Sequence, residues 1–565
     1  MGTTLRESLG YVPVELAFGT SGLRGRVADL SQLEVAINTL GFLRVLSERG
    51  VLRGGDTVCL AGDLRPSTTT AVELDGFVRG EMMQAVAWAV GKAGCEVDYL
   101  GLIPSPALMA YALRRGQASV MVTGSHIPFD RNGIKFNKTD GEVLKSDEGD
   151  ILRHVAAVRG ELMDEAAVES AFGADGRLNP SWRRALPEVN PSGGEEYVER
   201  YVQAFPRGAL RGKRLLVYQH SAVGRDLLVT MLERLGVELV VAGRSEQFIP
   251  VDTEAVQPAM LEAIQRLVDE QGGAAIDAVV STDGDSDRPL LLGVEQGKVH
   301  FFGGDLLGLV VADYLGARHV AIPVSANDAV DRFFSAKGVG VSKTRIGSPY
   351  VIAAMHEVGW EANGGFLTAR ALSVPGGGEL AALPTRDAFL PLLAALYASL
   401  GRGMSIVECF SRLPGRYGRA DVIREFPREI SLSLLETFMP ATKSIEEAWE
   451  KAGQWEVRDW GRSDRRAATA AEADDLTARQ TALQRAFGRV LQEAPVNWIN
   501  VCDGCRFGTD RGEILHLRPS GNAPEQRVYA VADSPSRAVE LVDQVVRPGG
   551  VIAELRREPE EGEGK

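Results

Sequence analysis

Residues 278–288 read AVVSTDGDSDR, an apolar run followed directly by a tight acidic loop. The run 278–281 predicts a short buried strand. The loop carries carboxylates at alternate positions, where they can converge on one hard cation: Asp283, Asp285 and Asp287. An EF-hand is excluded, because Arg288 and Val294 stand where that calcium loop needs glycine and glutamate. A strand-end site with an adjacent arginine favours Mg²⁺ shared with a phosphate, and the alternative is an acidic turn in solvent.

Outward from this strand, short apolar runs alternate with helical segments. The strands expected are 57–61, 96–100, 119–122, 213–218, 238–241 and 319–323, and the main helices expected begin at 31, 68, 224, 305 and 328. The segment 68–92 is expected to be one long helix. This alternation predicts an α/β fold of three units ending near residue 418, each with a mainly parallel sheet.

The last part of the chain differs from these units. Residues 431–493 are polar and predict helix, and strands are expected around Trp498, Ile514 and Val528. The polar stretches 159–195 and 440–480 are expected to be insertions or mobile surface elements. The sequence therefore predicts an α+β domain at the C-terminal end.

A second chemical signal follows the strand 119–122. Residues 123–128 read TGSHIP, and an exposed Ser125 at the tip of such a loop can act as a nucleophile if a base or a cation activates it. His126 is adjacent, and the Asn132-Gly133 pair predicts a turn that brings Lys135 back toward the serine. A hydrogen-bonded turn without chemistry is the alternative.

Three further loops are candidates for binding polar ligands. Residues 18–25, FGTSGLRG, combine glycines and hydroxyls with Arg24, and residues 518–522, RPSGN, combine Arg518 with Ser520. Backbone N–H groups, hydroxyls and a guanidinium together match phosphate oxygens. Residues 361–365, EANGG, offer a carboxylate and an amide that suit sugar hydroxyls. Each loop alone is also compatible with a plain surface turn.

Composition limits the classes of partner. The chain has 565 residues, with 62 Lys and Arg against 76 Asp and Glu, for a net charge of −14. An acidic chain disfavours a nucleic-acid or anionic-membrane surface as its main partner. No run approaches the roughly 18 apolar residues of a spanning helix, and the start lacks a signal-peptide core. Five cysteines fit reduced thiols in the cytoplasm, and the Cys502/Cys505 pair lacks the second pair a zinc site needs.

A candidate metal, a candidate nucleophile and separate anion loops indicate phosphoryl transfer in a cleft between domains. In this combination the sequence resembles the α-D-phosphohexomutases, the phosphomannomutase/phosphoglucomutase family. The motifs that carry the resemblance span nearly the whole chain in the family's order: FGTSGLRG (18–25), TGSHIPFDRNGIK (123–135), DGDSDR (283–288) and RPSGNAP (518–524). Two minor landmarks also fit: GDLRPS (62–67) and PSP (104–106).

The resemblance implies a four-domain architecture, with three similar α/β domains and a C-terminal α+β domain around a central cleft. The domains expected are 1–195 with the serine loop, 196–300 with the metal loop, 301–420 with the sugar loop and 421–565 with the phosphate loop. Mg²⁺ is the implied cofactor, with hexose 1,6-bisphosphate as activator. Small sugar phosphates are the implied partners, without nucleic acid or membrane, and a monomer or homodimer is expected.

The family's functional residues carry over by position. Ser125 would be the phosphoserine and would hold Mg²⁺ together with Asp283, Asp285 and Asp287. Lys135 and His126 would be the acid/base candidates, and the phosphoryl group would be steadied by Arg24, Arg288 and Thr20. The sugar would meet Glu361, Asn363, Gly347 and Ser348. The phosphate that does not react would be bound by Arg518, Ser520, Gly521, Asn522 and Arg527.

The sequence departs from the family pattern at three loops. The serine loop usually reads Thr-Ala-Ser-His-Asn-Pro, and here Gly124 and Ile127 replace alanine and asparagine. The sugar loop usually reads Gly-Glu-x-Ser-Gly-His, and here Asn363 and Gly365 replace serine and histidine. The missing histidine shifts the expected acid/base work to Lys135 and His126. In the phosphate loop, Asn522 and Ala523 replace threonine and glutamate.

The reaction expected from these residues is the interconversion of hexose 1-phosphate and hexose 6-phosphate. It would pass through phospho-Ser125 and a bound hexose 1,6-bisphosphate, with mannose as the first choice of sugar and glucose as the second. Three alternatives stay open: a phosphoglucosamine mutase, a Mg²⁺-dependent sugar phosphatase and a non-catalytic sugar-phosphate binding protein.

Overall fold

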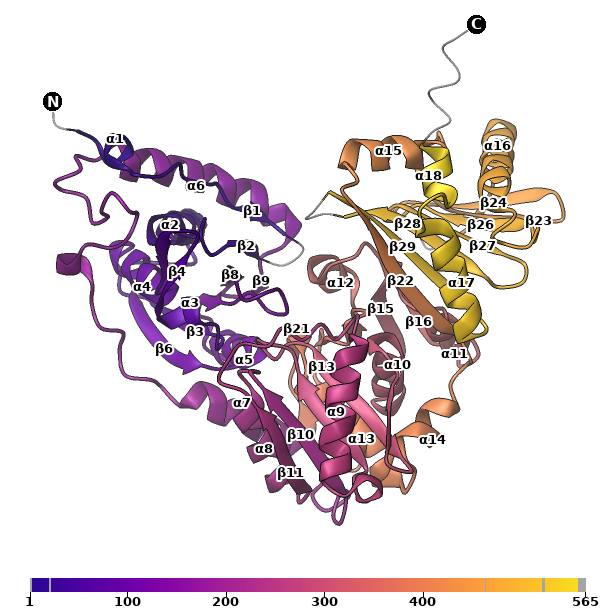
Figure 1. The fold of residues 1–565 in the computed structure, drawn as a ribbon, viewed down its shortest axis with the longest axis horizontal. Helices are drawn as coiled ribbons and strands as arrows, with labels where there is room; N and C mark the ends of the chain where they lie inside the picture. The colour runs from indigo at the N-terminus through magenta and orange to yellow at the C-terminus, as the bar shows by residue number, and fades with distance from the viewer. Residues whose placement is uncertain (1–2, 20–21, 463, 521–523, 557–565) are drawn as a thin grey trace, which may run out of the picture. The chain divides into compact units, whose positions relative to one another are not determined.

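The computed structural model describes residues 3–19, 22–462, 464–520 and 524–556. These residues form two compact units (Figure 1). The first unit contains the chain up to Ile322, together with Val339–Ser342 and Gly347–Arg412. The second unit contains Pro323–Gly338, Lys343–Ile346 and the chain from Leu413 onward.

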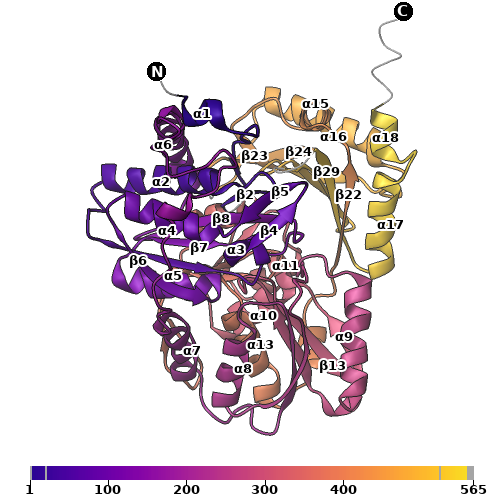
Figure 2. The same cartoon turned by 60° about the vertical axis from the view of Figure 1, so that its left-hand side comes forward.

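The first α/β block is built on a seven-stranded sheet whose order is β1-β2-β8-β7-β3-β6, with β9 paired to β8. Its strands are β1 Ala17–Phe18, β2 Leu23–Arg26, β3 Thr57–Gly62, β6 Glu96–Leu102, β7 Ser119–Val122, β8 Arg131–Lys138 and β9 Gly141–Glu142. Its main helices are α2 Gln32–Glu48, α4 Met82–Lys92, α5 Ser105–Arg115 and α6 Lys145–Asp164. Apolar side chains of α2, α4 and α6 form one buried core with this sheet. Figure 2 shows the three helices beside the strands of the sheet.

Two further blocks complete the first unit. One sheet has the order β11-β10-β12-β13-β14, from β10 Arg214–His220, β11 Glu238–Arg244, β12 Ala278–Thr282, β13 Pro289–Glu295 and β14 Lys298–Phe301. The other has the order β16-β15-β17-β18-β21, from β15 His319–Pro323, β16 Gly340–Thr344, β17 Val358–Trp360, β18 Phe366–Thr368 and β21 Leu383–Asp387. The helices beside them are α7 Ser192–Ala204, α8 Arg225–Arg234, α9 Pro258–Glu270, α10 Gly304–Tyr314, α12 Ser348–Ala354 and α13 Phe389–Ala398.

The sheets are mixed, so the expectation of mainly parallel sheets is wrong in part. Strands joined through a helix are parallel, as β3 is to β6 and β10 is to β11. Strands joined by a short loop, such as β7 and β8 or β12 and β13, are antiparallel, because a parallel crossover needs a dozen or more residues. The serine loop and the acidic loop are two of these short connections.

The second unit contains an eight-stranded antiparallel sheet in the order β22-β29-β28-β27-β26-β23-β24-β25. The strands are β22 Tyr417–Arg424, β23 Ile445–Lys451, β24 Gln454–Asp459, β25 Arg466–Ala467, β26 Val496–Asn500, β27 Cys505–Thr509, β28 Ile514–Pro519 and β29 Glu525–Ala532. The helices of this unit include α11 Ala329–Ser335, α15 Arg428–Glu436, α16 Ala470–Phe487, α17 Pro535–Val546 and α18 Val551–Leu555. Helix α17 lies along β22 and β29 (Figure 1).

Five predictions of local secondary structure or packing are wrong. Residues 431–493 are not helical throughout, because the hairpin of β23 and β24 lies inside them, and its Ile445 and Val457 belong to the buried core. The stretch 440–480 is therefore an integral part of the last sheet. The stretch 159–195 also joins a core, since Phe172 and Leu178 are buried against the first block. These polar stretches bury a few apolar residues each, and composition averaged over the stretch hides that pattern.

The remaining two corrections concern turns. Residues 71–80 form the hairpin of β4 Ala71–Leu74 and β5 Phe77–Gly80 ahead of α4, so the helix predicted over 68–92 starts late. Asn132 and Gly133 lie inside strand β8 and pair with Gly25 and Arg24 of β2, so they form no turn. Lys135 still points toward the acidic loop, because β8 itself runs back antiparallel to β7.

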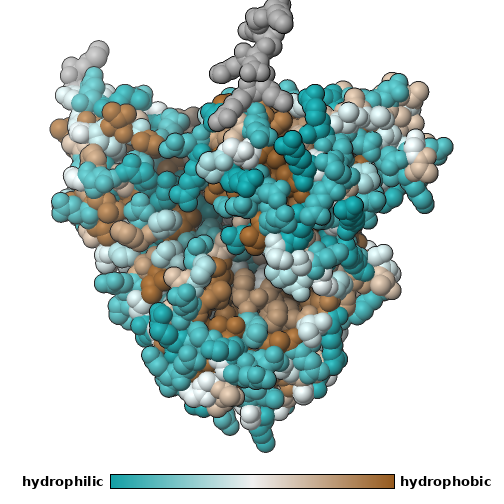
Figure 3. All heavy atoms as spheres, turned by 45° about the vertical axis from the view of Figure 1, so that its right-hand side comes forward, coloured by the Kyte–Doolittle hydropathy of each residue, from teal (hydrophilic) through white to brown (hydrophobic). Residues whose placement is uncertain are grey.

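Within the described part of the chain, no helix has the length and apolar character needed to cross a membrane. The face drawn in Figure 3 is mostly hydrophilic, with apolar side chains in scattered groups.

Candidate active site

Ser125 lies at the tip of the loop between β7 and β8, in the first unit. It is fully buried, so the expectation of an exposed serine is wrong, because the acidic loop covers it through Asp283. Its backbone is left-handed, with φ of 56°, a conformation that costs a residue with a β-carbon about 1–2 kcal/mol. The Ser125 hydroxyl donates to Oδ2 of Asp283 at 2.7 Å, and Nδ1 of His126 lies 3.4 Å from the same hydroxyl. The structure thus brings together the predicted nucleophile, one predicted metal ligand and one acid/base candidate.

A buried arginine holds the serine loop in this conformation. The Arg65 guanidinium donates to the carbonyls of Ser125 at 2.8 Å and Ile127 at 2.5 Å. It also donates to the carbonyls of Pro128 at 2.7 Å and Arg131 at 2.9 Å. Its charge is balanced by Asp63, whose Oδ2 lies 3.3 Å from the Arg65 Nε. A single guanidinium therefore satisfies four carbonyls of a loop that makes few backbone hydrogen bonds of its own.

The acidic loop between β12 and β13 folds around Asp283. Oδ1 of Asp283 accepts hydrogen bonds from the backbone N–H groups of Asp287 and Arg288, both at 3.1 Å. Ser286, between Asp285 and Asp287, has a left-handed φ of 58°. This turn brings carboxylate oxygens of Asp283, Asp285 and Asp287 within 4.8 Å of one another, and all three residues are buried.

These carboxylates fit a divalent cation. Burial, and then the charges of Asp285 and Asp287, raise the pKa of Asp283 well above its usual range. Oδ1 of Asp285 and Oδ1 of Asp287 are buried and have no hydrogen-bond partner among the described residues. Clustered carboxylate oxygens are the hard donors that Mg²⁺ prefers. The donor set therefore matches the metal expected from the sequence.

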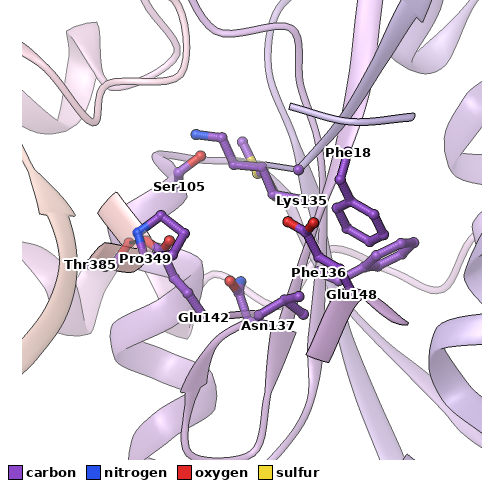
Figure 4. Close-up of a pocket in the computed structure, with 12 residues that line it drawn as sticks. Phe18, Ser105, Lys135, Phe136, Asn137, Glu142, Glu148, Pro349 and Thr385 are labelled. Carbon is purple, nitrogen blue, oxygen red and sulfur yellow. Dashed lines mark hydrogen bonds between the residues drawn. The ribbon is translucent and has the colours of Figure 1, made fainter. Parts of the chain in front are cut away.

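Lys135 and Ser105 contact the acidic loop from the first block. The Lys135 ammonium donates to Oδ2 of Asp285 at 2.6 Å and to Oδ2 of Asp287 at 2.7 Å. The Ser105 hydroxyl donates to Oδ2 of Asp285 at 2.6 Å. Both residues line the small pocket drawn in Figure 4, which Glu142 and Thr385 line as well. Lys135 thus lies at the acidic loop, as expected for an acid/base candidate.

Three guanidinium groups concentrate positive charge beside these carboxylates: Arg24, Arg288 and Arg386. Burial, and then the charges of Arg288 and Arg386, lower the pKa of Arg24 to about 10. Burial, and then Arg288 and Arg24, hold the pKa of His126 well below its ordinary value, which favours the neutral imidazole. The Arg24 Nη2 is buried without a hydrogen-bond partner in the described part of the chain. Unpaired buried guanidinium N–H groups suit a phosphate oxygen.

The sugar loop follows β17 and approaches the acidic loop through Arg386. The Arg386 Nη1 donates to Oε2 of Glu361 at 2.7 Å, and its Nη2 donates to Oδ2 of Asp287 at 2.8 Å. Oδ1 of Asn363 accepts from the backbone N–H of Gly365 at 3.0 Å, so this side chain shapes its own turn. Glu361 therefore lies in the same buried charge network as the metal loop.

Ser348 and its neighbour Gly347 start helix α12. The Ser348 hydroxyl donates to Oε2 of Glu142 at 3.0 Å, and the Thr385 hydroxyl donates to Oε1 of the same carboxylate at 2.5 Å. Glu142 thus joins the β8–β9 hairpin to both segments.

The phosphate loop belongs to the second unit. Arg518 and Arg527 lie opposite each other on β28 and β29. The backbone N–H of Ser520 donates to the Glu525 carbonyl at 2.8 Å, which closes the loop between these strands. The predicted residues Thr20, Gly521 and Asn522 lie outside the described residues.

Asp503, in the Cys502/Cys505 turn, supports Arg518. Oδ1 of Asp503 lies 3.1 Å from Nε of Arg518, and Oδ2 accepts from the Ile346 backbone N–H at 3.0 Å. Gly504 has φ of 83°, and a β-carbon there would lie 2.2 Å from the Leu517 carbonyl oxygen. The two cysteines are buried free thiols, so the role of this turn lies in its aspartate and glycine.

Sequence reasoning assigned no role to four residues that the structure places in or under these loops: Arg65, Ser105, Arg386 and Asp503. Arg65 and Ser105 stand in the two minor landmarks, which are a usable signal. Arg386 lies within strand β21 and has no local signal in the sequence.

Comparisons with known proteins identify the family of this chain. Residues 15–159 match the family model for phosphoglucomutase/phosphomannomutase, alpha/beta/alpha domain I, and residues 303–417 match the model for domain III. A phosphomannomutase of Sinorhizobium fredii is 37% identical over 93% of this chain and 97% of its own length. A phosphomannomutase of Salmonella muenchen is 35% identical over 94% of each chain.

The fold is also that of solved members of the family. The structure of a phosphoglucomutase/phosphomannomutase family protein from Burkholderia thailandensis matches with a TM-score of 0.63 at 16% identity, over 95% of this chain and 97% of that one. This likeness confirms the predicted multi-domain α/β architecture, and the relatives' identity over nearly the whole chain confirms the predicted family. The chain belongs to the α-D-phosphohexomutase family of enzymes, the phosphoglucomutases and phosphomannomutases.

Proposed function

We propose that this protein is a phosphohexomutase that interconverts hexose 1-phosphate and hexose 6-phosphate. The observation that carries the proposal is the position of the Ser125 hydroxyl, 2.7 Å from Asp283 in a cluster of three buried carboxylates. A hydroxyl beside a cation site is suited to carry a phosphoryl group. Family membership supports the same reaction.

In the proposed cycle, phospho-Ser125 transfers its phosphoryl group to the free hydroxyl of the bound hexose monophosphate. The serine O–P bond breaks and a sugar O–P bond forms. The hydroxyl proton passes to the neutral imidazole of His126, and Lys135, an ammonium beside Asp285 and Asp287, is the proton donor to the serine oxygen. The hexose 1,6-bisphosphate then presents its other phosphate, and Ser125 accepts that phosphoryl group. When bound by Ser125, Asp283, Asp285 and Asp287, Mg²⁺ would neutralise charge on the transferring group.

The remaining predicted residues take binding roles in this proposal. Arg24 and Arg288 would bind the transferring phosphoryl group with Thr20, and Glu361 and Asn363 would bind sugar hydroxyls beside Gly347 and Ser348. The phosphate that does not react would be bound by Arg518, Ser520, Gly521, Asn522 and Arg527. The Arg24 Nη2 has no hydrogen-bond partner among the described residues, and this supports its role in binding the transferring phosphoryl group.

We propose mannose as the preferred sugar and glucose as the second, with hexose 1,6-bisphosphate as activator. The two phosphomannomutase relatives support mannose. Both sugars can be accepted, because the orientation of the 2-hydroxyl is a small difference for a site that binds phosphate and the other hydroxyls. We place the enzyme in the cytoplasm, as a monomer or homodimer, and its five free cysteines support that compartment.

We retain the predicted domains 1–195, 196–300, 301–420 and 421–565 as a proposal. The two matched family models, 15–159 and 303–417, each fall within one of these ranges.

The test is ³¹P NMR of the purified protein with Mg²⁺ and catalytic hexose 1,6-bisphosphate. Mannose 1-phosphate and glucose 1-phosphate are supplied in separate tubes. Appearance of 6-phosphate establishes the mutase, and the two rates rank the sugars. Release of inorganic phosphate alone would identify a phosphatase, and no change in either tube would favour a sugar-phosphate binding protein.

A further inference from the structure

We propose that Arg386 fills the place of the histidine missing from the sugar loop and acts as the positioning residue for Glu361 and Asp287. This inference rests on the proposed function, since it concerns the same site. It is drawn from the space around Gly365 and from the contacts of the Arg386 guanidinium.

The space beside Gly365 is occupied by the stem of Arg386. A β-carbon at residue 365 would lie 2.6 Å from Cδ, 2.8 Å from Cγ and 2.9 Å from Cβ of Arg386. Non-bonded carbons pack at about 3.5–4.0 Å, so no side chain can start at residue 365 while Arg386 keeps this position. Gly365 directly precedes β18 and Arg386 lies on the adjacent strand β21. A side chain at residue 365 and the side chain of Arg386 would therefore occupy the same volume.

The guanidinium joins two loops that come from different sheets. Nη1 of Arg386 donates to Oε2 of Glu361 at 2.7 Å. Nη2 and Nε donate to Oδ2 of Asp287 at 2.8 and 3.1 Å. The side chain of Arg386 is 3% exposed, and those of Asp287 and Glu361 are 3% and 8% exposed. Buried charge-assisted hydrogen bonds of this kind are strong and directional.

Only a forked cation can make these contacts together. Lysine presents a point charge, whereas arginine presents five N–H donors in a rigid plane. By binding one oxygen of Glu361, Arg386 fixes the direction of the other oxygen, which the sugar hydroxyls would meet. By binding Asp287, it sets the distance between the sugar loop and the metal loop.

The backbone of Arg386 is itself held in place. The next residue, Asp387, accepts from the Tyr197 hydroxyl at 2.6 Å and from the Tyr201 hydroxyl. Asp387 also accepts from the Phe389 backbone N–H at 2.9 Å, at the start of α13. The guanidinium therefore projects from a fixed point.

This assignment changes the chemistry expected at the position. A histidine there could exchange a proton with the substrate, whereas a guanidinium stays protonated in proteins. Arg386 therefore supplies a fixed cation and a fixed orientation, and proton transfer stays with the other candidates of the site.

The test compares Arg386→Met, Arg386→Ala and Arg386→Lys with the wild type in steady-state assays of hexose 1-phosphate conversion. We expect Arg386→Met to raise KM for the sugar phosphate by about tenfold or more, since a hydrogen bond to a charged group contributes about 1.5–3 kcal/mol. Arg386→Lys should recover only part of this loss.

Millimolar guanidinium chloride should partly restore the activity of Arg386→Ala, where it can enter the vacated space, and should not restore the activity of Arg386→Met. The matched control is Arg370→Met, which removes a half-exposed arginine paired with Glu357 and should leave both constants unchanged.

A second arm tests the shared volume. Gly365→Ala should lose activity, because its methyl group collides with Arg386. The double variant Gly365→Ala/Arg386→Ala should be no worse than Arg386→Ala alone, since the collision is gone. The single variant Gly365→Ala keeps Arg386, so it stays informative if an arginine variant folds poorly, and circular dichroism checks each protein.

Wild-type KM and kcat in Arg386→Met, or simple additivity of the two alanine substitutions, would overturn the inference. Lack of any 6-phosphate from the wild-type enzyme would instead overturn the proposed function.

Discussion

Replacing Arg65 by methionine removes the support beneath Ser125 while keeping a side chain of similar length. Arg65 is 1% exposed, and its guanidinium donates hydrogen bonds to four carbonyls of the serine loop, at 2.5 to 2.9 Å. Its loss also leaves the Asp63 carboxylate, 3.3 Å from Nε and fully buried, without its cation. Removing one partner of a buried ion pair costs about 3–5 kcal/mol, and this is the destabilisation expected for the first unit.

The effect on activity should exceed what that destabilisation produces. Without the four donors, the left-handed backbone of Ser125 is no longer held, and relaxing it gains about 1–2 kcal/mol. The hydroxyl then leaves its 2.7 Å contact with Asp283. A displacement of about 1 Å at a reacting group costs about 100-fold in rate, so kcat should fall by about that factor in protein that is still folded.

The double variant Asp63→Asn/Arg65→Met separates the two effects. It leaves no unpaired charge, so it should regain part of the free energy of unfolding, measured by urea titration. It should not regain kcat, because the carbonyls stay without donors. Intact-mass spectrometry after incubation with hexose 1,6-bisphosphate should show slow phosphorylation of Ser125 in both variants. Wild-type kcat and phosphorylation in the double variant would refute the claim that Arg65 positions the serine.

Three further outcomes are expected. Ser125→Ala should abolish conversion of hexose 1-phosphate while circular dichroism and the unfolding midpoint stay close to wild type, and retained mutase activity would contradict the phosphoserine assignment. Asp503→Asn removes the charge beside Arg518 and should raise KM for the sugar phosphate more than it lowers kcat, whereas equal KM values would show that the aspartate does not support the phosphate loop. His220 and His516 are buried with pKa values lowered to about 4 by burial, so the folded state keeps them neutral while the unfolded state binds protons below about pH 6.5. The free energy of unfolding should therefore fall as pH drops from about 6.5 toward 4, by up to about 1.4 kcal/mol per pH unit for each histidine. Urea titrations at several pH values should show a shallower slope in His220→Asn, and an unchanged slope would mean that this histidine does not contribute.

Much of the site can be predicted from short stretches of sequence. The predicted strands 278–281 and 119–122 match β12, Ala278–Thr282, and β7, Ser119–Val122, and the acidic loop and the serine loop follow them as predicted. Both motifs combine an apolar run with polar residues at fixed spacing, and local patterns of this kind can be recognised in the sequence alone. The contact between Ser125 and Asp283 followed from the family resemblance.

Other parts could not be predicted from local pattern. The hairpin 445–459 and the hairpin 71–80 lie in polar stretches, where a few buried side chains decide the structure and composition does not. Lys135 was expected at the site for a wrong reason, since it is carried there by strand β8 and not by a turn.

What the sequence determined by itself is the chemistry of the loops: a serine, three alternating aspartates and an arginine, each at the end of a strand. What only the tertiary structure decided is which charges lie beneath and between those loops. Arg65 meets the serine loop across about 60 positions of the chain, and Arg386 meets Asp287 across 99. Contacts at that separation depend on how the sheets pack, and they leave no periodic pattern in the sequence. A buried arginine needs a carboxylate as its partner, and the sequence alone does not say which carboxylate that is.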